Sequence, residues 1–439
     1  MVNSRKTEKP SLSQVEKLYL GILLVIFGGI VLHAPISVGL STLFPDYALF
    51  VKSWKEVLMF VAIITVGIIL YKKRQFKVLK EPLMLASGVY AAIHLVLLPI
   101  LWQGLTSSEA GLMIDLRYVL YFSLVYIAIR IYPEYRRKFI ILGVVGALIV
   151  FVFAILQVFI LPYDVLKYIG YSKDTIVPYL VVDRNYDYLR INSTLRGPNP
   201  LGAYACIGLG LLVSWTIFNR NKLKKLGTLL LVVLIAFGGF VALWSSYSRS
   251  AAGAAIITVA IVLGLRFRHK ITKKIWIICI ILLFSVVSLL LTFKNTSFVS
   301  QTILHENPGM VDTPSSNDGH VNSLRDGLKR VLMQPLGGGV GGTGSASLYS
   351  TSPLTIENQY LFIAHEAGWL GLIVFMYIFA EVLRQLWKHR QDYLAVGVFA
   401  SGLGLAVIGL LLPVWADDTV SIVWWGLAGI ALGGGRYRE

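Results

Sequence analysis

The sequence predicts an all-α, polytopic membrane protein with about 12 transmembrane helices and both termini in the cytoplasm. Its 439 residues are 56% hydrophobic and only 14% charged, with a mean hydropathy of +0.71. This balance is typical of membrane proteins rather than soluble domains. Apolar runs recur along the chain, and basic residues gather in every second loop between them. The chain therefore reads as a single transmembrane domain, residues 1–439.

Apolar segments of about 20 residues are long enough to cross roughly 30 Å of hydrocarbon. The segments that qualify are residues 18–34, 54–71, 82–102, 111–130, 139–161, 199–218, 227–244, 250–265, 275–293, 359–381, 393–412 and 417–433. The first follows a basic start, as a signal peptide would. No small-residue cleavage site follows it, so we expect it to be retained as a span.

Lysine and arginine mark one side of the membrane. They cluster in residues 72–80, 130–138, 219–225, 266–274, 384–390 and 436–438. This alternation follows the positive-inside rule, so the net charge of +17 indicates topology rather than nucleic-acid binding. The remaining loops are assigned to the outer face of the membrane. Two of them are long, 162–198 and 294–358, and we expect these two to cover an active site that faces outward.

The outer side carries basic residues that topology does not explain. They are Arg117, Arg184, Arg190, Arg196, Arg249, Arg325, Lys329 and Arg330. Guanidinium is a planar fork of donors that matches phosphate and carboxylate, and charge at a membrane edge is usually paired or functional. Converging arginines therefore indicate an anionic ligand. The alternative is structural pairing, with Asp115 for Arg117 and with neighbouring aspartates for Arg184.

Arg249 is the arginine that is hardest to explain structurally. It stands in WSSYSRSAAGAA, between two spans joined by a very short outer turn. The small residues around it are Ser245, Ser246, Ser248, Ser250, Ala251, Ala252 and Gly253. Small residues allow helices to approach closely, so we expect Arg249 to face protein or ligand rather than lipid.

The long loop between the ninth and tenth spans predicts an amphipathic helix over VNSLRDGLKRVLMQ, residues 321–334. Its apolar residues recur at helical spacing, and Arg325 and Lys329 lie four apart on the polar side. We expect this helix to lie at the outer surface or on the bundle. The glycine-rich PLGGGVGGTGS that follows is interpreted as a plain loop, or as a mobile lid whose amides approach a phosphate. It lacks the spacing of a P-loop.

Glu357 stands where this loop re-enters the membrane, and His365 and Glu366 follow about two helical turns later. Glu357 is a candidate general base; the alternative is a carboxylate favoured by a helix N-terminus. Glu366 is interpreted as a buried hydrogen-bonding partner. Carboxylates, histidines and the cysteines Cys206 and Cys279 show no metal-site pattern and no disulfide framework, so no metal and no cofactor are expected.

Four segments in order resemble motifs of the O-antigen ligase and O-antigen polymerase superfamily. The segment RINSTLRGPNPLGAY is similar to its R-x-x-G-x-F-x-x-P-N motif, and SYSRSA resembles its S-R-[GS] motif. The stretch SLRDGLKRVLMQPLGGGVG is similar to its R…P-L-x-G-x-G stretch, and ENQYLFIAHEAGWLGL to its H-N-x-Y-L…E-x-G-x-x-G segment. The resemblance covers residues 185–375. In this chain Ser193 replaces the motif glycine, Leu195 the aromatic residue and Glu357 the histidine.

The resemblance implies a metal-independent glycosyltransferase that uses a glycan on undecaprenyl diphosphate at the outer leaflet. The essential arginines of the family carry over to Arg190 and Arg249, with Arg196 and Arg325 as further diphosphate ligands. Asn199, Asn358, His365 and Glu366 are expected in supporting roles. An acidic residue in place of the histidine favours a polymerase, for which flippase and chain-length-regulator proteins are the expected partners.

Two alternatives remain open from the sequence. A ligase would transfer the finished glycan to a lipid, wall or protein acceptor. A flippase or another transporter also fits about twelve spans with charges near the midplane. Against a transporter, the sequence shows no repeat of two halves, and polar residues concentrate in the outer loops.

Overall fold

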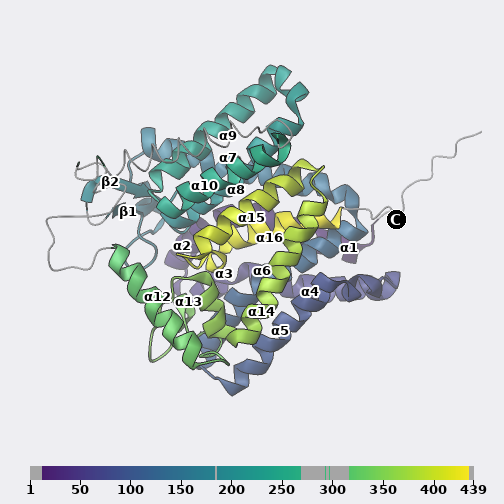
Figure 1. Ribbon diagram of the computed structural model, residues 1–439, viewed down its shortest axis with the longest axis vertical. Helices are drawn as coiled ribbons and strands as arrows, with labels where there is room; N and C mark the ends of the chain where they lie inside the picture. Colours follow the sequence, from purple (N-terminus) through teal and green to yellow (C-terminus); the bar gives the residue numbers. More distant parts are fainter. Residues whose placement is uncertain (1–11, 183–184, 268–291, 293–295, 297–315, 435–439) are drawn as a thin grey trace, which may run out of the picture.

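The computed structural model describes residues 12–182, 185–267, 292, 296 and 316–434, and within these ranges it is a bundle of antiparallel helices (Figure 1). Nine candidate spans among the described residues are long and apolar enough to cross a membrane, and two shorter apolar helices, α15 and α16, accompany them. Eleven of the predicted segments fall on these helices. The predicted span 275–293 lies outside the described residues.

The bundle helices follow the apolar segments closely. They are α1 (Gln14–Gly29), α4 (Trp54–Lys73), α5 (Pro82–Ile100), α6 (Leu105–Ile131), α7 (Arg136–Phe159), α8 (Pro198–Phe218), α9 (Leu226–Ser245), α10 (Arg249–Phe267), α14 (Gln359–Lys388), α15 (Tyr393–Gly409) and α16 (Asp418–Gly433). The first candidate span continues from α1 through a 3₁₀ turn into α2 (His33–Leu43).

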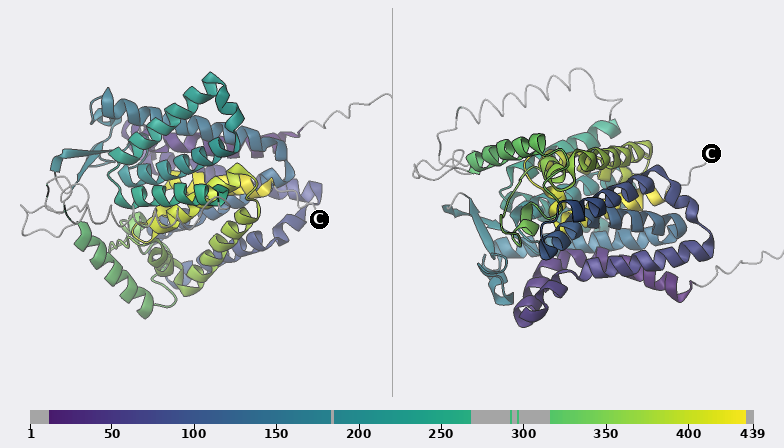
Figure 2. Two further views of the ribbon diagram at one scale, coloured as in Figure 1. Left: turned by 45° about the horizontal axis from the view of Figure 1, so that its top comes forward. Right: turned by 90° about the horizontal axis from the view of Figure 1, so that it is seen from below.

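One end of the bundle collects the basic loops that lie within the described residues. Three ion pairs fix this arrangement: Lys73 at the end of α4 reaches Glu16 in α1, Arg130 at the end of α6 reaches Glu81, and Arg136 at the start of α7 reaches Asp392. The opposite end carries the β-hairpin and α12 (Ser316–Met333), while α1 begins and α16 ends away from them (Figure 2). The loops predicted to share a side of the membrane therefore lie together in space.

The core forms where α16 crosses α6. Gly429 and Gly433 let the two backbones approach, because a Cβ on Gly433 would lie 2.7 Å from the carbonyl oxygen of Tyr126. Aromatic rings fill the space beside this contact and are fully or almost fully buried. They are Tyr118, Phe122, Phe375, Phe379, Trp415, Trp424 and Trp425. This tightly packed centre positions the start of α16 near the end of the bundle that carries the hairpin and α12.

The all-α prediction missed a small β-hairpin in the first long loop. Strand β1 (Tyr179–Val182) pairs antiparallel with β2 (Asn185–Ile191), with Leu180 opposite Arg190. Strand β2 approaches the bundle at its C-terminal end, since Ile191 is buried whereas Tyr186 and Asp187 are exposed. The predicted amphipathic helix is confirmed as α12, which begins at Ser316, earlier than expected.

Candidate functional site

Arg190 is bonded to the turn between α9 and α10, which Arg249 follows in the chain. Arg190 on β2 donates from Nε to the Ser246 carbonyl at 2.8 Å and from a terminal nitrogen to Oδ1 of Asn199 at 2.7 Å. Arg249 begins α10 three residues after Ser246, and its side chain is exposed. The small residues around Arg249 act as predicted, because a Cβ on Gly202 of α8 would lie 2.7 Å from Cβ of Ala251. The strand and the turn thus bring the two arginine segments together.

The turn between β2 and α8 anchors Arg190 from the other side. Ser193 is fully buried and has a left-handed φ of 51°, a conformation that favours glycine. Its amide donates to Oε1 of Gln157 at 3.0 Å, and its hydroxyl donates to the Val150 carbonyl at 2.7 Å. These bonds to α7 hold the turn in place. They also explain why a glycine motif position accepts serine in this chain.

An aromatic pair joins β2 to the turn between α9 and α10. The rings of Tyr188 on β2 and Tyr247 meet edge to face with centroids 6.0 Å apart. Tyr247 has a φ of 46°. Burial, with a smaller contribution from Tyr188, raises the pKa of Tyr247, so its hydroxyl stays protonated at neutral pH and adds no negative charge beside the arginines.

Two adjoining cavities open at the end of the bundle opposite the basic loops. The polar cavity, about 290 Å³, lies among α2, α4, α6, the short helix α13 (Gly344–Ser347) and the start of α16. The apolar cavity, about 340 Å³, lies among α8, α14, α15 and the segment before α16, with Phe362, Ile408 and Leu412 in its wall. Arg196 and Asp417 line both cavities, and Arg196 is exposed within them.

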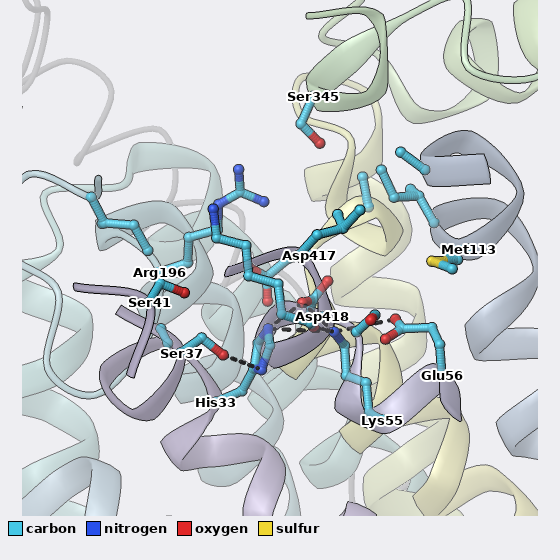
Figure 3. Close-up of a pocket in the computed structure, with 18 of the residues that line it drawn as sticks. His33, Ser37, Ser41, Lys55, Glu56, Met113, Arg196, Ser345, Asp417 and Asp418 are labelled. Atoms are coloured by element: carbon cyan, nitrogen blue, oxygen red, sulfur yellow. Dashed lines mark hydrogen bonds and ion pairs between the residues drawn. The ribbon is translucent and has the colours of Figure 1, made fainter. Parts of the chain in front are cut away.

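A network of charged side chains forms the floor of the polar cavity (Figure 3). Asp418 lies at its centre: it pairs with Arg117, with Nζ of Lys55 at 3.0 Å and with Nε2 of His33 at 2.8 Å. Glu56 lies 3.2 Å from Lys55. Because each charge has an opposite neighbour, the network tolerates a position within the bundle.

This network corrects one prediction and adds residues that the sequence analysis missed. Arg117 pairs with Asp418 rather than Asp115, which instead lies 3.5 Å from His94. The reason is geometric, because positions two apart on a helix do not face each other. Charged residues in or beside apolar segments, Lys55 and Asp418 among them, were a usable signal. Arg184 and His305 lie outside the described residues.

Glu357 and Arg325 belong to a second group, built around α12. The amide of Glu357 donates to Oγ of Ser323 at 3.1 Å, and Ser323 also reaches the Thr355 carbonyl. Arg325, two residues further along α12, is exposed. Thr355 lines the apolar cavity, as does Asn199, the partner of Arg190. Each group therefore reaches the apolar cavity through one partner residue, Asn199 for Arg190 and Thr355 for the α12 group.

The motif residues after Glu357 hold the glycine-rich loop. Asn358 caps α14, since its Oδ1 accepts from the amides of Tyr360 and Leu361. Glu366 is 1% exposed and accepts from the amides of Gly341 and Thr343. This bears out the interpretation of Glu366 as a buried hydrogen-bonding partner.

His365 fills the space under the same loop, where a Cβ on Gly338 would lie 2.4 Å from its Nε2. The interpretation of the loop as a phosphate-binding lid was wrong. Amides of Gly338, Gly341, Gly342, Thr343 and Gly344 donate to acceptors within the protein, and most of residues 337–343 are buried. Four glycines with positive φ, at 337, 339, 341 and 344, are what allow the backbone to pack this tightly.

Part of the amino-acid sequence matches a known protein family. Residues 234–376 match the family model described as O-Antigen ligase. This range holds Arg249, Arg325, Glu357 and the glycine-rich loop. The chain therefore resembles the superfamily of O-antigen ligases and O-antigen polymerases. The family match covers three of the four sequence motifs and supports the resemblance that they carry.

A curated relative in this superfamily is an O-antigen polymerase of Salmonella muenchen. It is 24% identical over 216 residues, which cover 48% of this chain. The match spans 51% of the relative, so the chain covers about half of the length of that protein. Arg190 and Arg196 lie before residue 234, outside the range of the family model. Groups of three or more histidine, cysteine or acidic side chains that could hold a metal ion are absent from the described residues.

Proposed function

We propose that this protein polymerises repeat units of a surface polysaccharide. It transfers a glycan from undecaprenyl diphosphate to the terminal sugar of another lipid-linked glycan on the outer leaflet. The observation that carries the proposal is the tether of Arg190 to Ser246 and Asn199, because it brings Arg190 to the turn of Arg249 at the border of the apolar cavity. The family match covers the Arg249 segment.

The arginines stabilise the charge that develops as the donor breaks apart. The acceptor hydroxyl oxygen bonds to C1 of the donor sugar from the face opposite the diphosphate. The C1–O bond breaks, its electron pair stays on the diphosphate oxygen, and the configuration at C1 inverts. Guanidinium groups of Arg190, Arg249, Arg196 and Arg325 bind that oxygen and its neighbours. The first turn of α10 adds the positive end of a helix dipole at Arg249.

Glu357 accepts the proton of the attacking hydroxyl or orients that hydroxyl by a hydrogen bond. Its backbone is fixed, since its amide is bonded to Ser323 of α12 and the next residue, Asn358, is held by its bond to the Leu410 carbonyl. Because diphosphate is a good leaving group, correct positioning supplies much of the rate. The acidic side chain stands where most ligases of the superfamily carry histidine, which favours the polymerase.

The test replaces Arg249 by lysine in a strain that depends on this protein for its polysaccharide. Arg249→Lys keeps the charge but loses the fork of donors, so we expect a roughly 10- to 100-fold loss of polymer, corresponding to about 1.5–3 kcal/mol. Arg266→Lys is the matched control, since Arg266 is an exposed arginine at the other end of the same helix. Undiminished chain length in Arg249→Lys, with normal membrane levels, contradicts the proposal.

The ligase remains the second candidate, because the family model is described as O-Antigen ligase. Deletion of the protein separates the two reactions. A polymerase deletion leaves single repeat units on the cell surface, whereas a ligase deletion leaves polymer on the lipid carrier. We expect single repeat units, and accumulated lipid-linked polymer would replace the polymerase by the ligase.

A further inference from the structure

The polar cavity is chemically distinct from an anion site. Its cationic lining residues are Lys52, Lys55, Arg117 and Arg196. Its acidic lining residues are Glu56, Asp174, Asp417 and Asp418. Four cations and four acids balance when His33 is neutral, so a diphosphate entering this space would meet as many carboxylates as cations. Such a lining favours a ligand without net charge.

The lining also offers hydrogen-bonding atoms that the protein leaves unused. Oε2 of Glu56, Nε of Arg117 and Oγ of Ser41 are buried and have no hydrogen-bond partner among the described residues. Arg117 is 4% exposed and Lys55 is 2% exposed. Buried polar atoms of this kind are costly unless a ligand or water satisfies them. The cavity thus offers both acceptors and donors, and a sugar hydroxyl can bond to either because it donates and accepts.

The polar cavity adjoins the apolar cavity, which is the proposed site of the donor. Arg196 and Asp417 form part of the wall between the polar and the apolar cavities. The apolar cavity borders Asn199, the partner of Arg190, and suits the lipid-linked end of a donor. A hydroxyl that attacks from the polar side of this wall would approach from the side opposite the lipid. In Figure 3 Ser345 faces the charged floor from across the cavity, so a ligand would lie between them.

We propose that the polar cavity binds the neutral terminal sugars of the acceptor glycan. This inference rests on the proposed function and deepens it, because it assigns the acceptor to a separate site. Carboxylates of Glu56 and Asp417 accept from sugar hydroxyls, and Nε of Arg117 donates to a sugar oxygen. Apolar side chains such as Met113 and Tyr349 cover the carbon faces of the ring. The cavity volume of about 290 Å³ sets the ligand length at one or two sugar units.

The test fills the cavity without touching the arginines. Met113 lines the cavity on α6 and is 39% exposed. Met376 on α14 is 42% exposed and lines neither cavity, which makes Met376→Trp the matched control for Met113→Trp. The full chain is placed in lipid nanodiscs. The probes are the repeat-unit glycan, released from the lipid-linked pool of the producing cells by mild acid, and inorganic diphosphate. Saturation-transfer NMR reports binding of the glycan, and isothermal titration calorimetry reports binding of diphosphate.

We expect Met113→Trp to weaken glycan binding by at least about 10-fold while diphosphate binding stays within about twofold of wild type. The control should bind both probes normally. If Met113→Trp does not fold, Ser41→Leu makes the same test, because Ser41 supplies one of the unused hydroxyls. Glycan binding that is unchanged in these variants overturns the inference.

The two proposals fail separately. Loss of glycan binding in Met113→Trp together with full polymer length in Arg249→Lys would remove the diphosphate role and keep the glycan site. The reverse pattern would keep the diphosphate role and remove the glycan site. An anionic glycan fragment that binds more tightly than a neutral one also overturns the inference, since the balanced lining predicts the opposite order.

Discussion

Ser193 shows which backbone conformation the glycine position of the first motif requires. The left-handed φ of 51° is imposed by the tight turn between β2 and α8, and a non-glycine residue there costs about 1–2 kcal/mol. The hydroxyl offsets part of this cost through its bond to the Val150 carbonyl. A motif glycine can thus be replaced where a small side chain finds a buried partner.

This account predicts the order of two substitutions at Ser193. Ser193→Ala keeps the unfavourable φ and loses the hydroxyl bond, so it should destabilise the protein by about 1 kcal/mol. Ser193→Gly loses the same bond but removes the strain, so its stability should stay close to wild type. Thermal unfolding followed by tryptophan fluorescence in nanodiscs measures both. A lower melting temperature for Ser193→Gly than for Ser193→Ala would show that the turn does not require this φ.

At the residue level, the sequence predicted which charged residues matter better than it predicted the residues that they contact. It singled out Arg117 and Glu366, but it paired Arg117 with its near neighbour Asp115. The true contacts of Arg117, with Asp418 and the Ala416 carbonyl, join positions about 300 residues apart. Periodicity carries no information on such pairs, because they depend on how whole helices pack.

Among the elements, α14 shows how a helix and a loop depend on each other. Gly368 interrupts the helix with φ 68° and ψ −176°. The interruption lets the chain at Pro335 cross, since the Trp369 amide donates to the Pro335 carbonyl at 2.9 Å. Glu366 then holds the next part of the loop. The E-x-G motif is in this way a clamp for the glycine-rich loop, which forms part of the cavity walls through Gly344 and Ser345.

Gly368→Ala should therefore be strongly destabilising. A Cβ would lie 2.7 Å from the Pro335 carbonyl oxygen, and an L-residue in this backbone region costs on the order of 1–3 kcal/mol before any clash. Gly67→Ala is the control, because a Cβ on Gly67 of α4 meets nothing within 4 Å. Membrane-inserted yield and melting temperature give the comparison. Equal values for the two variants would rule out the clamp.

Sequence periodicity predicted the helices well and the loops poorly. Apolar runs marked the spans, and helical spacing marked α12. The β-hairpin was missed because its strands are short and one lies in a segment rich in aspartate and asparagine. The packing of the glycine-rich loop was missed because it depends on distant partners, such as Gln103, which donates to the Gly338 carbonyl at 2.6 Å.

Across the whole molecule, antiparallel packing sorts the chain into two chemically different ends. One end has the basic loops and their ion pairs, and the other has the hairpin, α12 and two adjoining cavities. The order of the segments explains why side chains from separate loops line a single cavity. Arg196 comes from the first long loop, Asn199, the partner of Arg190, from the start of α8, and Thr355 from the second long loop.

The central claim is that Arg190 and Arg249 bind one lipid diphosphate. Binding of undecaprenyl diphosphate to the full chain in nanodiscs tests it, with Arg190→Lys, Arg249→Lys, the double variant and the Arg266→Lys control. We predict that each single change weakens binding by about 10-fold or more, with a coupling of at least about 0.5 kcal/mol in the double variant. The control should match wild type. Wild-type affinity in either single variant, or strictly additive losses in the double variant, would contradict the account.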